Sequence, residues 1–403
     1  MEQNGWFHEA EEEQMCSEDN NILGTEEYGF KDLLVKHQSL TAQWLPDATR
    51  PEGEDYLLHQ LILGTQTESG QQNYLVIANV QIPDENPRCH DLDYDDKSVN
   101  WKVEIQMKMN HEGKVNKACF MPQKQCIIAT QTSYGDVLIF DSTKQPSEND
   151  PSGKCSPELT LKGHGQVEYG LSWNPIINGY LVSASYDHAI RVWDVNSMFA
   201  KRGVIGAIAT VKEHSSVVND VAWHPFYQNM FGSVGNDESL MIWDTRLYRT
   251  AHIVRAHAAA VNCLAFNPYR EFILATGSAD ETIALWDLRN LKSALFSIES
   301  HKDAIIQLQW SPHNEKLLAS SGRDQRLYVW DISDLGAEQS TDNPTDDPPE
   351  LLSIRCEHNG DIFQFSWNPN EPRVICSVTE ENIVQFWKMA EHDYYIELWN
   401  YWH

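Results

Sequence analysis

The chain has 403 residues, of which 41% are hydrophobic and 10% aromatic, so it can build a packed core and is not a disordered chain. Its 59 acidic residues outnumber 30 basic ones and give a formal net charge of −29. Because phosphate contacts need an excess of Lys and Arg, we expect no direct binding to nucleic acid and favour a basic protein partner. No apolar run of about 18 residues and no secretory leader is present, so we expect no membrane association.

The acidic N-terminal segment, residues 1–30, contains nine acids and no Lys or Arg, which predicts a loose tail with at most a short helix. Residues 31–37 then resemble the strand that precedes each later repeat. Four further segments predict the strands of a degenerate first repeat: Ser39–Pro46, His59–Thr65, Tyr74–Ile82 and Lys102–Met109.

Six later histidines start one spacing pattern. Nine residues after each stands an aromatic residue followed by x-Pro, nineteen after it a Ser or Thr, and twenty-nine after it another aromatic residue, five times Trp. The histidines are His111, His164, His214, His257, His301 and His358. A pattern kept within the unit while the spacing between units varies is typical of a WD-repeat β-propeller.

Within a repeat, the His, the Ser or Thr, an Asp twenty-three residues after the His, and the Trp can form a hydrogen-bonded chain that fixes strand register. The expected members are His164, Ser183, Asp187 and Trp193; His257, Thr276, Asp280 and Trp286; and His301, Ser320, Asp324 and Trp330. In the first full repeat, Tyr134 takes the Asp position. His, Ser and Asp also form hydrolase triads, but their recurrence and the lack of a Gly-x-Ser-x-Gly elbow favour a structural role. We therefore expect no catalytic residues and no enzyme.

The last repeat supplies three strands, near 361–368, 373–378 and 382–388, but no fourth. We expect the segment at 31–37 to complete it, because this closes the ring and removes an exposed sheet edge. The prediction is an all-β fold, a seven-bladed WD-repeat β-propeller over 31–390 closed by an N-terminal strand. Short helical or loose extensions are expected at 1–30 and 391–403.

An acidic, Pro-containing insertion occupies residues 334–350. Long propeller loops usually carry partner contacts, so we expect a binding loop, with a solvated spacer as the alternative. The eight cysteines are scattered without a Cys-x-x-Cys pair, which fits a reducing compartment and predicts no metal site and no cofactor.

Several phrases of the sequence resemble one family closely. They include Ser-Leu-Thr-Ala-Gln-Trp-Leu-Pro-Asp (39–47), Tyr-Gly-Leu-Ser-Trp-Asn-Pro (169–175), Phe-Ile-Leu-Ala-Thr-Gly-Ser-Ala-Asp (272–280), Ala-Leu-Trp-Asp-Leu-Arg-Asn-Leu-Lys (284–292) and Trp-Asn-Pro-Asn-Glu-Pro (367–372). From about 39 to 390 the chain is similar to the retinoblastoma-binding, histone-binding WD-repeat proteins, the small-subunit type of chromatin assembly factor. The resemblance implies a non-catalytic scaffold subunit of chromatin assembly, deacetylase, remodelling or Polycomb-type complexes. It also implies a location in the nucleus, with the cytoplasm as a second location.

The resemblance further implies a lateral groove that holds a helix of histone four between an N-terminal helix and the acidic loop. The groove residues on the loop would be Asp342, Asp346, Asp347, Pro348, Pro349, Glu350, Leu351 and Leu352. Carboxylates would pair with Arg and Lys of the basic helix, and the leucines would add apolar contact. The two leucines can equally begin the next outer strand. The N-terminal segment is shorter than the family's helix, and residues 391–403 carry Trp399, Tyr401 and Trp402 in place of an acidic tail.

The family also binds the histone-three tail on the axial face of the propeller. Asn116, Tyr169, Asn262 and Glu380 match that site. Several acidic positions of the site are instead occupied by Lys114, Val167, Asn219 and Ala304, which weakens any site for Arg or Lys. The lateral groove is therefore the expected main site.

Two other functions stay open. Trp243-Asp244-Thr245-Arg246 and Trp286-Asp287-Leu288-Arg289 fit the Trp-Asp-x-Arg box of substrate receptors of cullin-type ubiquitin ligases, although such an Arg can simply pair with a nearby carboxylate. The other alternative is a diverged propeller that has lost histone binding.

Overall fold

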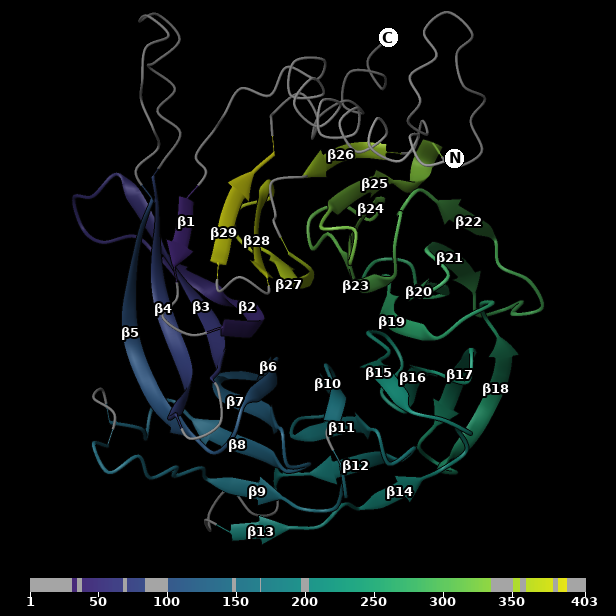
Figure 1. The fold of residues 1–403 in the computed structure, drawn as a ribbon, viewed down its shortest axis with the longest axis horizontal. Coiled ribbons are helices and arrows are strands. Elements are labelled where there is room, and N and C mark those ends of the chain that lie inside the picture. Colours follow the sequence, from purple (N-terminus) through teal and green to yellow (C-terminus); the bar gives the residue numbers. More distant parts are fainter. Residues whose placement is uncertain are drawn as a thin grey trace, which may run out of the picture.

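Seven β-sheets stand side by side around a common centre in the computed structural model (Figure 1). The structure describes residues 31–34, 38–67, 71–83, 101–146, 150–166, 168–196, 203–334, 351–355, 360–379 and 383–389. Apart from the short 3-10 helix η3 (Ile332–Asp334), every regular element in these ranges is a strand. The predicted all-β, seven-bladed propeller is confirmed.

The first three blades each begin with an innermost strand and add further strands outward. Blade 1 contains β2 (Gln38–Thr49), β3 (Tyr56–Gln66), β4 (Asn73–Pro83) and β5 (Lys102–His111). Blade 2 contains β6 (Val115–Met121), β7 (Lys124–Thr132), β8 (Val137–Asp141), β9 (Leu159–Leu161) and a fifth strand, β13 (Gly203–Ile205). Blade 3 contains β10 (Glu168–Trp173), β11 (Tyr180–Ser185), β12 (Ile190–Asp194) and β14 (Ala209–Val211).

The remaining four blades follow the same plan. Blade 4 contains β15 (Val218–Trp223), β16 (Met230–Gly235), β17 (Ser239–Asp244) and β18 (Arg249–Arg255), and blade 5 contains β19 (Val261–Phe266), β20 (Ile273–Ser278), β21 (Thr282–Asp287) and β22 (Phe296–Glu299). Blade 6 contains β23 (Ile305–Trp310), β24 (Leu317–Gly322), β25 (Leu327–Asp331) and β26 (Leu351–Arg355), and blade 7 contains β27 (Ile362–Trp367), β28 (Val374–Thr379), β29 (Ile383–Lys388) and β1 (Lys31–Leu34). Because neighbouring strands are antiparallel, the turns from first to second strand and from third to fourth lie on one face, which we call the turn face. The links between blades lie on the other, the axial face.

The N-terminal strand closes the ring as the sequence predicts. β1 pairs antiparallel with β29, with Lys31 opposite Phe386 and Leu34 opposite Ile383. The interface between blades 7 and 1 is apolar, and the ring of Phe386 lies 5.6 Å from that of Trp44 and 5.8 Å from that of Trp101, measured between centroids. Pairing the first strand with the last leaves neither as an open edge at the junction.

Blade 2 differs from the predicted four-stranded plan. β13 runs parallel to β9, with Gly203 opposite Leu159 and Ile205 opposite Leu161, and it forms a fifth, outermost strand. The backbone amide of Lys162 donates to the carbonyl of Ile205 at 3.0 Å. The extra chain between Trp193 and Trp243 therefore covers the short edge strand β9 before it continues into blade 3 as β14.

A belt of side-chain hydrogen bonds joins the blades on the turn face. Its donors come from the turns between first and second strands, and its acceptors come from the next blade. The bonds are Gln123 Nε2 to Asn174 O (2.9 Å), Asn174 Nδ2 to Gln228 O (2.9 Å), His224 Nε2 to Glu271 O (2.8 Å), Asn267 Nδ2 to Glu315 O (2.9 Å), His313 Nε2 to Asn368 O (2.9 Å) and Asn368 Nδ2 to His59 Nδ1 (3.3 Å). Since these groups are largely buried, the belt satisfies polar atoms that would otherwise weaken the junctions.

Truncation of one blade tryptophan tests this architecture. Trp286 is buried in the core shared by blades 4 and 5, and its Nε1 donates to Thr276 Oγ1 at 2.9 Å. We expect Trp286→Ala to lower the free energy of unfolding by about 3–5 kcal/mol, as large core truncations do. Trp286→Phe should cost much less, because Phe140 fills the equivalent position of blade 2 without an N–H. Urea unfolding measures both, and a Trp286→Ala variant as stable as the parent would contradict the repeat assignment.

Candidate functional site

The repeat residues come together as buried hydrogen-bonded chains in blades 3 to 6. The distance from His Nε2 to the hydroxyl oxygen is 2.8 Å in blades 3 and 5 and 2.7 Å in blades 4 and 6, and the Trp Nε1 donates to the same oxygen at 2.8–2.9 Å. On the other side, His Nδ1 faces the Asp carboxylate at 2.9–3.2 Å. The four hydroxyl residues Ser183, Ser233, Thr276 and Ser320 are completely buried. A substrate has no access to them, so the chain serves the framework and not a hydrolase.

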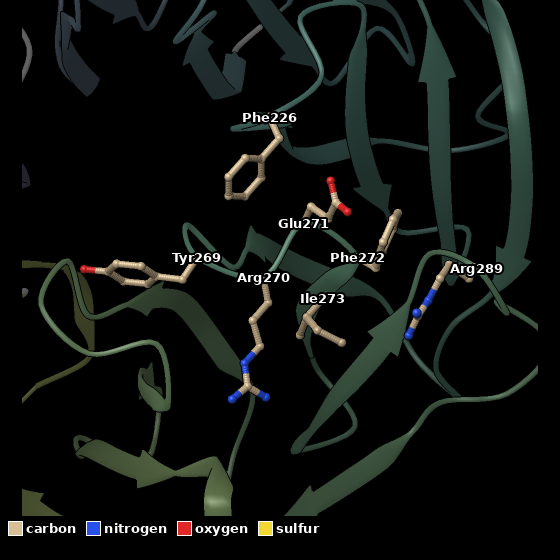
Figure 2. Close-up of a pocket in the computed structure, with 7 residues that line it drawn as sticks. All are labelled: Phe226, Tyr269, Arg270, Glu271, Phe272, Ile273 and Arg289. Carbon is tan, nitrogen blue, oxygen red and sulfur yellow. The ribbon is translucent and has the colours of Figure 1, made fainter.

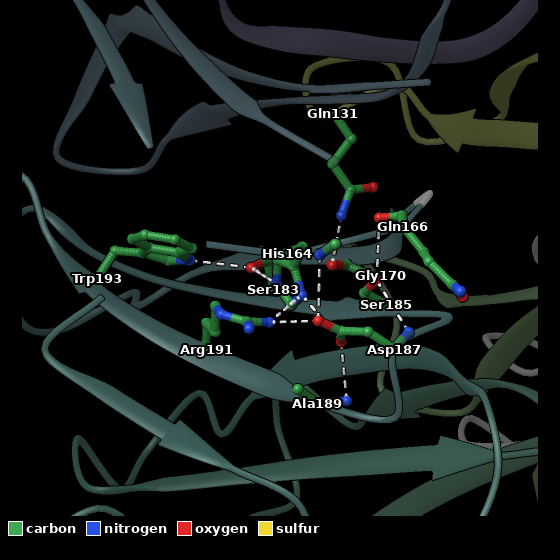
Figure 3. A network of polar contacts seen from close by, with 11 residues as sticks. Gln131, His164, Gln166, Gly170, Ser183, Ser185, Asp187, Ala189, Arg191 and Trp193 are labelled. Atoms are coloured by element: carbon green, nitrogen blue, oxygen red, sulfur yellow. Dashed lines mark hydrogen bonds and ion pairs between the residues drawn. The ribbon is translucent and has the colours of Figure 1, made fainter. Parts of the chain in front are cut away.

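Blade 3 adds a cation to its chain (Figure 3). Arg191 Nη1 donates to Asp187 Oδ2 at 2.9 Å and also contacts His164 Nδ1. Burial alone would raise the pKa of Asp187, but the hydrogen bonds and charges of His164 and Arg191 outweigh it and hold that pKa well below its usual range. Asp187 therefore remains ionised between two partners.

Blade 2 lacks both ends of the chain. His111 Nε2 lies 2.9 Å from Thr130 Oγ1, but its Nδ1 lies 2.9 Å from the carbonyl of Gly113 and Phe140 replaces the tryptophan. Tyr134, at the Asp position, is 70% exposed. Burial lowers the pKa of His111 to about 4, so its ring is neutral near pH 7 and donates to the Gly113 carbonyl.

The expected axial residues occupy one repeated position. Each innermost strand has a β-bulge near its start, and the bulged residues are Leu40, Asn116, Tyr169, Asn219, Asn262, Ile306 and Phe363. Bulges re-aim side chains, and here they recur once per blade at the axial face. We call these seven positions the bulge ring. It contains three of the four predicted axial residues, and Glu380 lies outside the described residues.

The bulge ring has no charged member. Asn262 Nδ2 donates to the carbonyl of Ile305 at 2.7 Å, Asn219 Nδ2 to that of Val261 at 2.9 Å, and Asn116 Nδ2 to that of Thr132 at 3.5 Å. These amides bind the backbone of their own or the next blade. The recurrent Val-Asn dipeptide at 115–116, 218–219 and 261–262 was the sequence signal for this position.

Most of the predicted lateral groove cannot be located, because Asp342, Asp346, Asp347, Pro348, Pro349 and Glu350 lie outside the described residues. The described ends of this loop are η3 and β26. Leu351 pairs with Trp330 as the first residue of β26 and packs against the core of blades 5 and 6, while Leu352 packs against the core of blades 6 and 7. Both leucines are half-buried, which fits their alternative role as the start of the outer strand.

The two Trp-Asp-x-Arg boxes show the same internal ion pair. Arg246 Nε donates to Asp244 Oδ1 at 2.9 Å and its Nη2 to Asp244 Oδ2 at 2.5 Å, and Arg289 makes the same pair of contacts with Asp287. Each guanidinium thus binds the Asp of its own box, and this geometry does not favour a ligase-adaptor contact.

Within the ranges that the structure describes, no group of three or more His, Cys, Asp or Glu side chains is arranged to hold a metal ion. In those same ranges, no helix is long and apolar enough to cross a membrane.

Comparison with protein-family models agrees with this geometry. The model for the WD domain, G-beta repeat, matches residues 155–194, 206–244, 248–287 and 292–331. Each match starts at or before the outer strand of one blade and ends with the third strand of the next, so the repeat and the blade are offset by one strand. The chain is therefore a WD-repeat propeller.

A second model, which describes the histone-binding protein RBBP4 or the equivalent component of the CAF1 complex, matches residues 32–84. This match covers β1 to β4, the closing strand and the degenerate first blade, where the WD repeat is not recognised. The chain belongs to the RBBP4-type, histone-binding WD-repeat family, as the resemblance predicted.

Buried neutral histidines make the stability of the propeller depend on pH. Burial lowers the pKa of His59 and His111 to about 4, and burial also lowers that of His224, whose Nδ1 accepts from the amides of Phe226 and Tyr227. Since the unfolded chain binds these protons first, their contribution is complete above pH 6.5 and is lost as the pH falls towards 4, at up to about 1.4 kcal/mol per pH unit for each group.

His224→Asn isolates one of these groups. Asn174, Asn267 and Asn368 make the same belt contacts in other blades without titrating. We expect the variant to retain stability near pH 7 and to lose less of it at pH 4.5 than the parent, as measured by urea unfolding at both pH values. An unchanged pH dependence would show that His224 does not titrate in this range.

Proposed function

We propose that this protein is a non-catalytic scaffold that binds histones for chromatin assembly, deacetylase, remodelling or Polycomb-type complexes in the nucleus. The observation that carries the proposal is the family match at residues 32–84, because it covers the blade that distinguishes this family from other WD-repeat proteins. The net charge of −29 favours basic partners in the same way. The buried hydroxyls of the repeat chains support a framework without catalysis.

The main histone site is a lateral groove beside blades 6 and 7, and the topology supports this position. The acidic loop 335–350 joins the propeller at Leu351, opposite Trp330 near the turn-face end of β25. The N-terminal segment joins it at Lys31, opposite Phe386 towards the turn-face end of β29. Both segments therefore join outer strands of neighbouring blades near the same face, so they can form the two sides of one groove.

The chemistry of the loop suits a basic amphipathic helix such as the first helix of histone four. Asp342, Asp346, Asp347 and Glu350 supply carboxylates for Arg and Lys, and Pro348 and Pro349 limit the conformations of the loop. Leu351 and Leu352, half-buried at the base of the loop, supply apolar surface. Binding of a helix in a groove uses this combination of charged rim and apolar anchors.

Charge reversal on the loop tests the groove. We expect Asp346→Lys together with Asp347→Lys to weaken binding of a histone-four first-helix peptide by about 2 kcal/mol or more, roughly thirtyfold in Kd, if those charges are desolvated in the complex. Calorimetric titration measures the change. The matched control is Glu52→Lys with Glu54→Lys, which makes the same charge change in an exposed turn of blade 1. Equal loss in both variants would assign the effect to net charge and remove the loop from the mechanism.

The axial face is a secondary site, because the bulge ring offers amides but no carboxylate. Restoring acids should therefore strengthen it. We expect Lys114→Glu with Asn219→Glu to tighten binding of a histone-three tail peptide by about 1–2 kcal/mol, while affinity for the histone-four helix stays the same. Polarisation titrations with both peptides measure this, and unchanged axial affinity would mean that the bulge ring does not contact the tail.

A further inference from the structure

Two adjoining hollows open on the turn face and share one wall. One, of about 470 Å³, is lined by residues of blades 4 and 5 that include Phe226, Tyr269, Arg270 and Arg289 (Figure 2). The other, of about 440 Å³, lies between blades 5 and 6 and is lined by Tyr269, Leu308, Trp310 and Pro312 among others. Tyr269 therefore separates two hollows with largely apolar walls.

The rim of this surface is aromatic and open to solvent. Phe226 and Tyr269 are 43% and 45% exposed, although large aromatic side chains usually bury most of their surface. Two guanidinium groups stand beside them. Arg270 binds Glu315 and Arg289 binds Asp287 through Nε and Nη2, so the Nη1 of each can still donate. The surface can accept aromatic side chains accompanied by carboxylates.

The chain carries a segment of that chemistry. Residues 390–403 contain five aromatic residues, with Trp399 and Trp402 three residues apart, together with Glu391, Asp393 and Glu397 and no Lys or Arg. So many aromatic side chains in a short segment gain free energy when they are buried against apolar surface. Its carboxylates complement the two guanidinium groups.

The segment also starts on the correct face. The last described residue, Met389, follows the third strand of blade 7, and its backbone amide donates to the carbonyl of Arg373 at 2.8 Å. Leu288 occupies the equivalent position of blade 5, where its amide donates at 2.8 Å to the carbonyl of Phe272, a residue of the first hollow. Fourteen extended residues reach about 46 Å, most of the roughly 55 Å diameter expected for a compact domain of this length.

We infer that residues 390–403 fold back across the turn face from blade 7 and place aromatic side chains in the two hollows beside Tyr269. This intramolecular contact covers the exposed aromatic rim. It does not involve the bulge ring or the acidic loop, and it does not depend on the proposed histone binding.

Limited chymotrypsin digestion of the full chain tests the inference, because this protease cuts after Tyr, Trp and Phe and acts on the undocked segment. Mass spectrometry would follow cleavage within 390–403 in the parent, in Tyr269→Asp and in Phe296→Asp. Phe296 is the matched control: it is also 45% exposed but lies on the outer strand β22. We expect cleavage about tenfold faster in Tyr269→Asp than in the parent and unchanged in Phe296→Asp.

Three results would overturn the inference. Equally fast cleavage in all three proteins means that the segment does not dock, and equally slow cleavage means that it docks elsewhere. Protection that increases with protein concentration means that a second copy supplies the segment. Phe226→Ser, on the opposite wall of the first hollow, provides the same comparison if Tyr269→Asp unfolds, which thermal unfolding of each variant would reveal.

Discussion

Backbone hydrogen bonds between β1 and β29 join residues 31–34 to residues 383–386, near the two ends of the described chain. A ring of seven blades needs this contact, since each repeat unit supplies the outer strand of one blade and the inner strands of the next. Without β1, blade 7 would lack its fourth strand and the apolar interface around Trp44, Trp101 and Phe386 would lose its support. The same contact brings the N-terminal segment beside the base of the acidic loop. Closure of the ring and formation of the proposed groove therefore depend on one pair of strands.

Inside the ring, two sets of polar contacts hold the blades on opposite faces. The His, hydroxyl and Trp chains fix the strands within blades near the axial face, and the belt of Asn, Gln and His side chains joins neighbouring blades on the turn face. Both sets are buried, so each donor needs its acceptor and the register of the strands is strongly specified. A rigid framework of this kind leaves function to loops and surface positions, where the sequence departs from the repeat.

The fold could be predicted from the sequence where chemistry repeats. Blade strands, the closing strand and the partners of His257 and His301 all follow from spacing, because each unit must satisfy the same local hydrogen bonds. Strand β13 could not be predicted, since the insertion that contains it has no counterpart in other repeats. The turn belt and bulge ring depend on contacts between blades, such as Asn267 with Glu315, so they are evident only after the ring is built. The lateral site stays a prediction from resemblance, because the carboxylates that would form it lie outside the described residues.

The central claim is that a basic histone helix binds beside blades 6 and 7. Hydrogen exchange of the full chain, measured with and without the histone-four first-helix peptide, tests it most directly. We predict slower exchange confined to the acidic loop, β26 and the N-terminal segment next to β1, with the bulge ring unchanged. Protection centred on the bulge ring, or none at a saturating peptide concentration, would contradict the lateral groove.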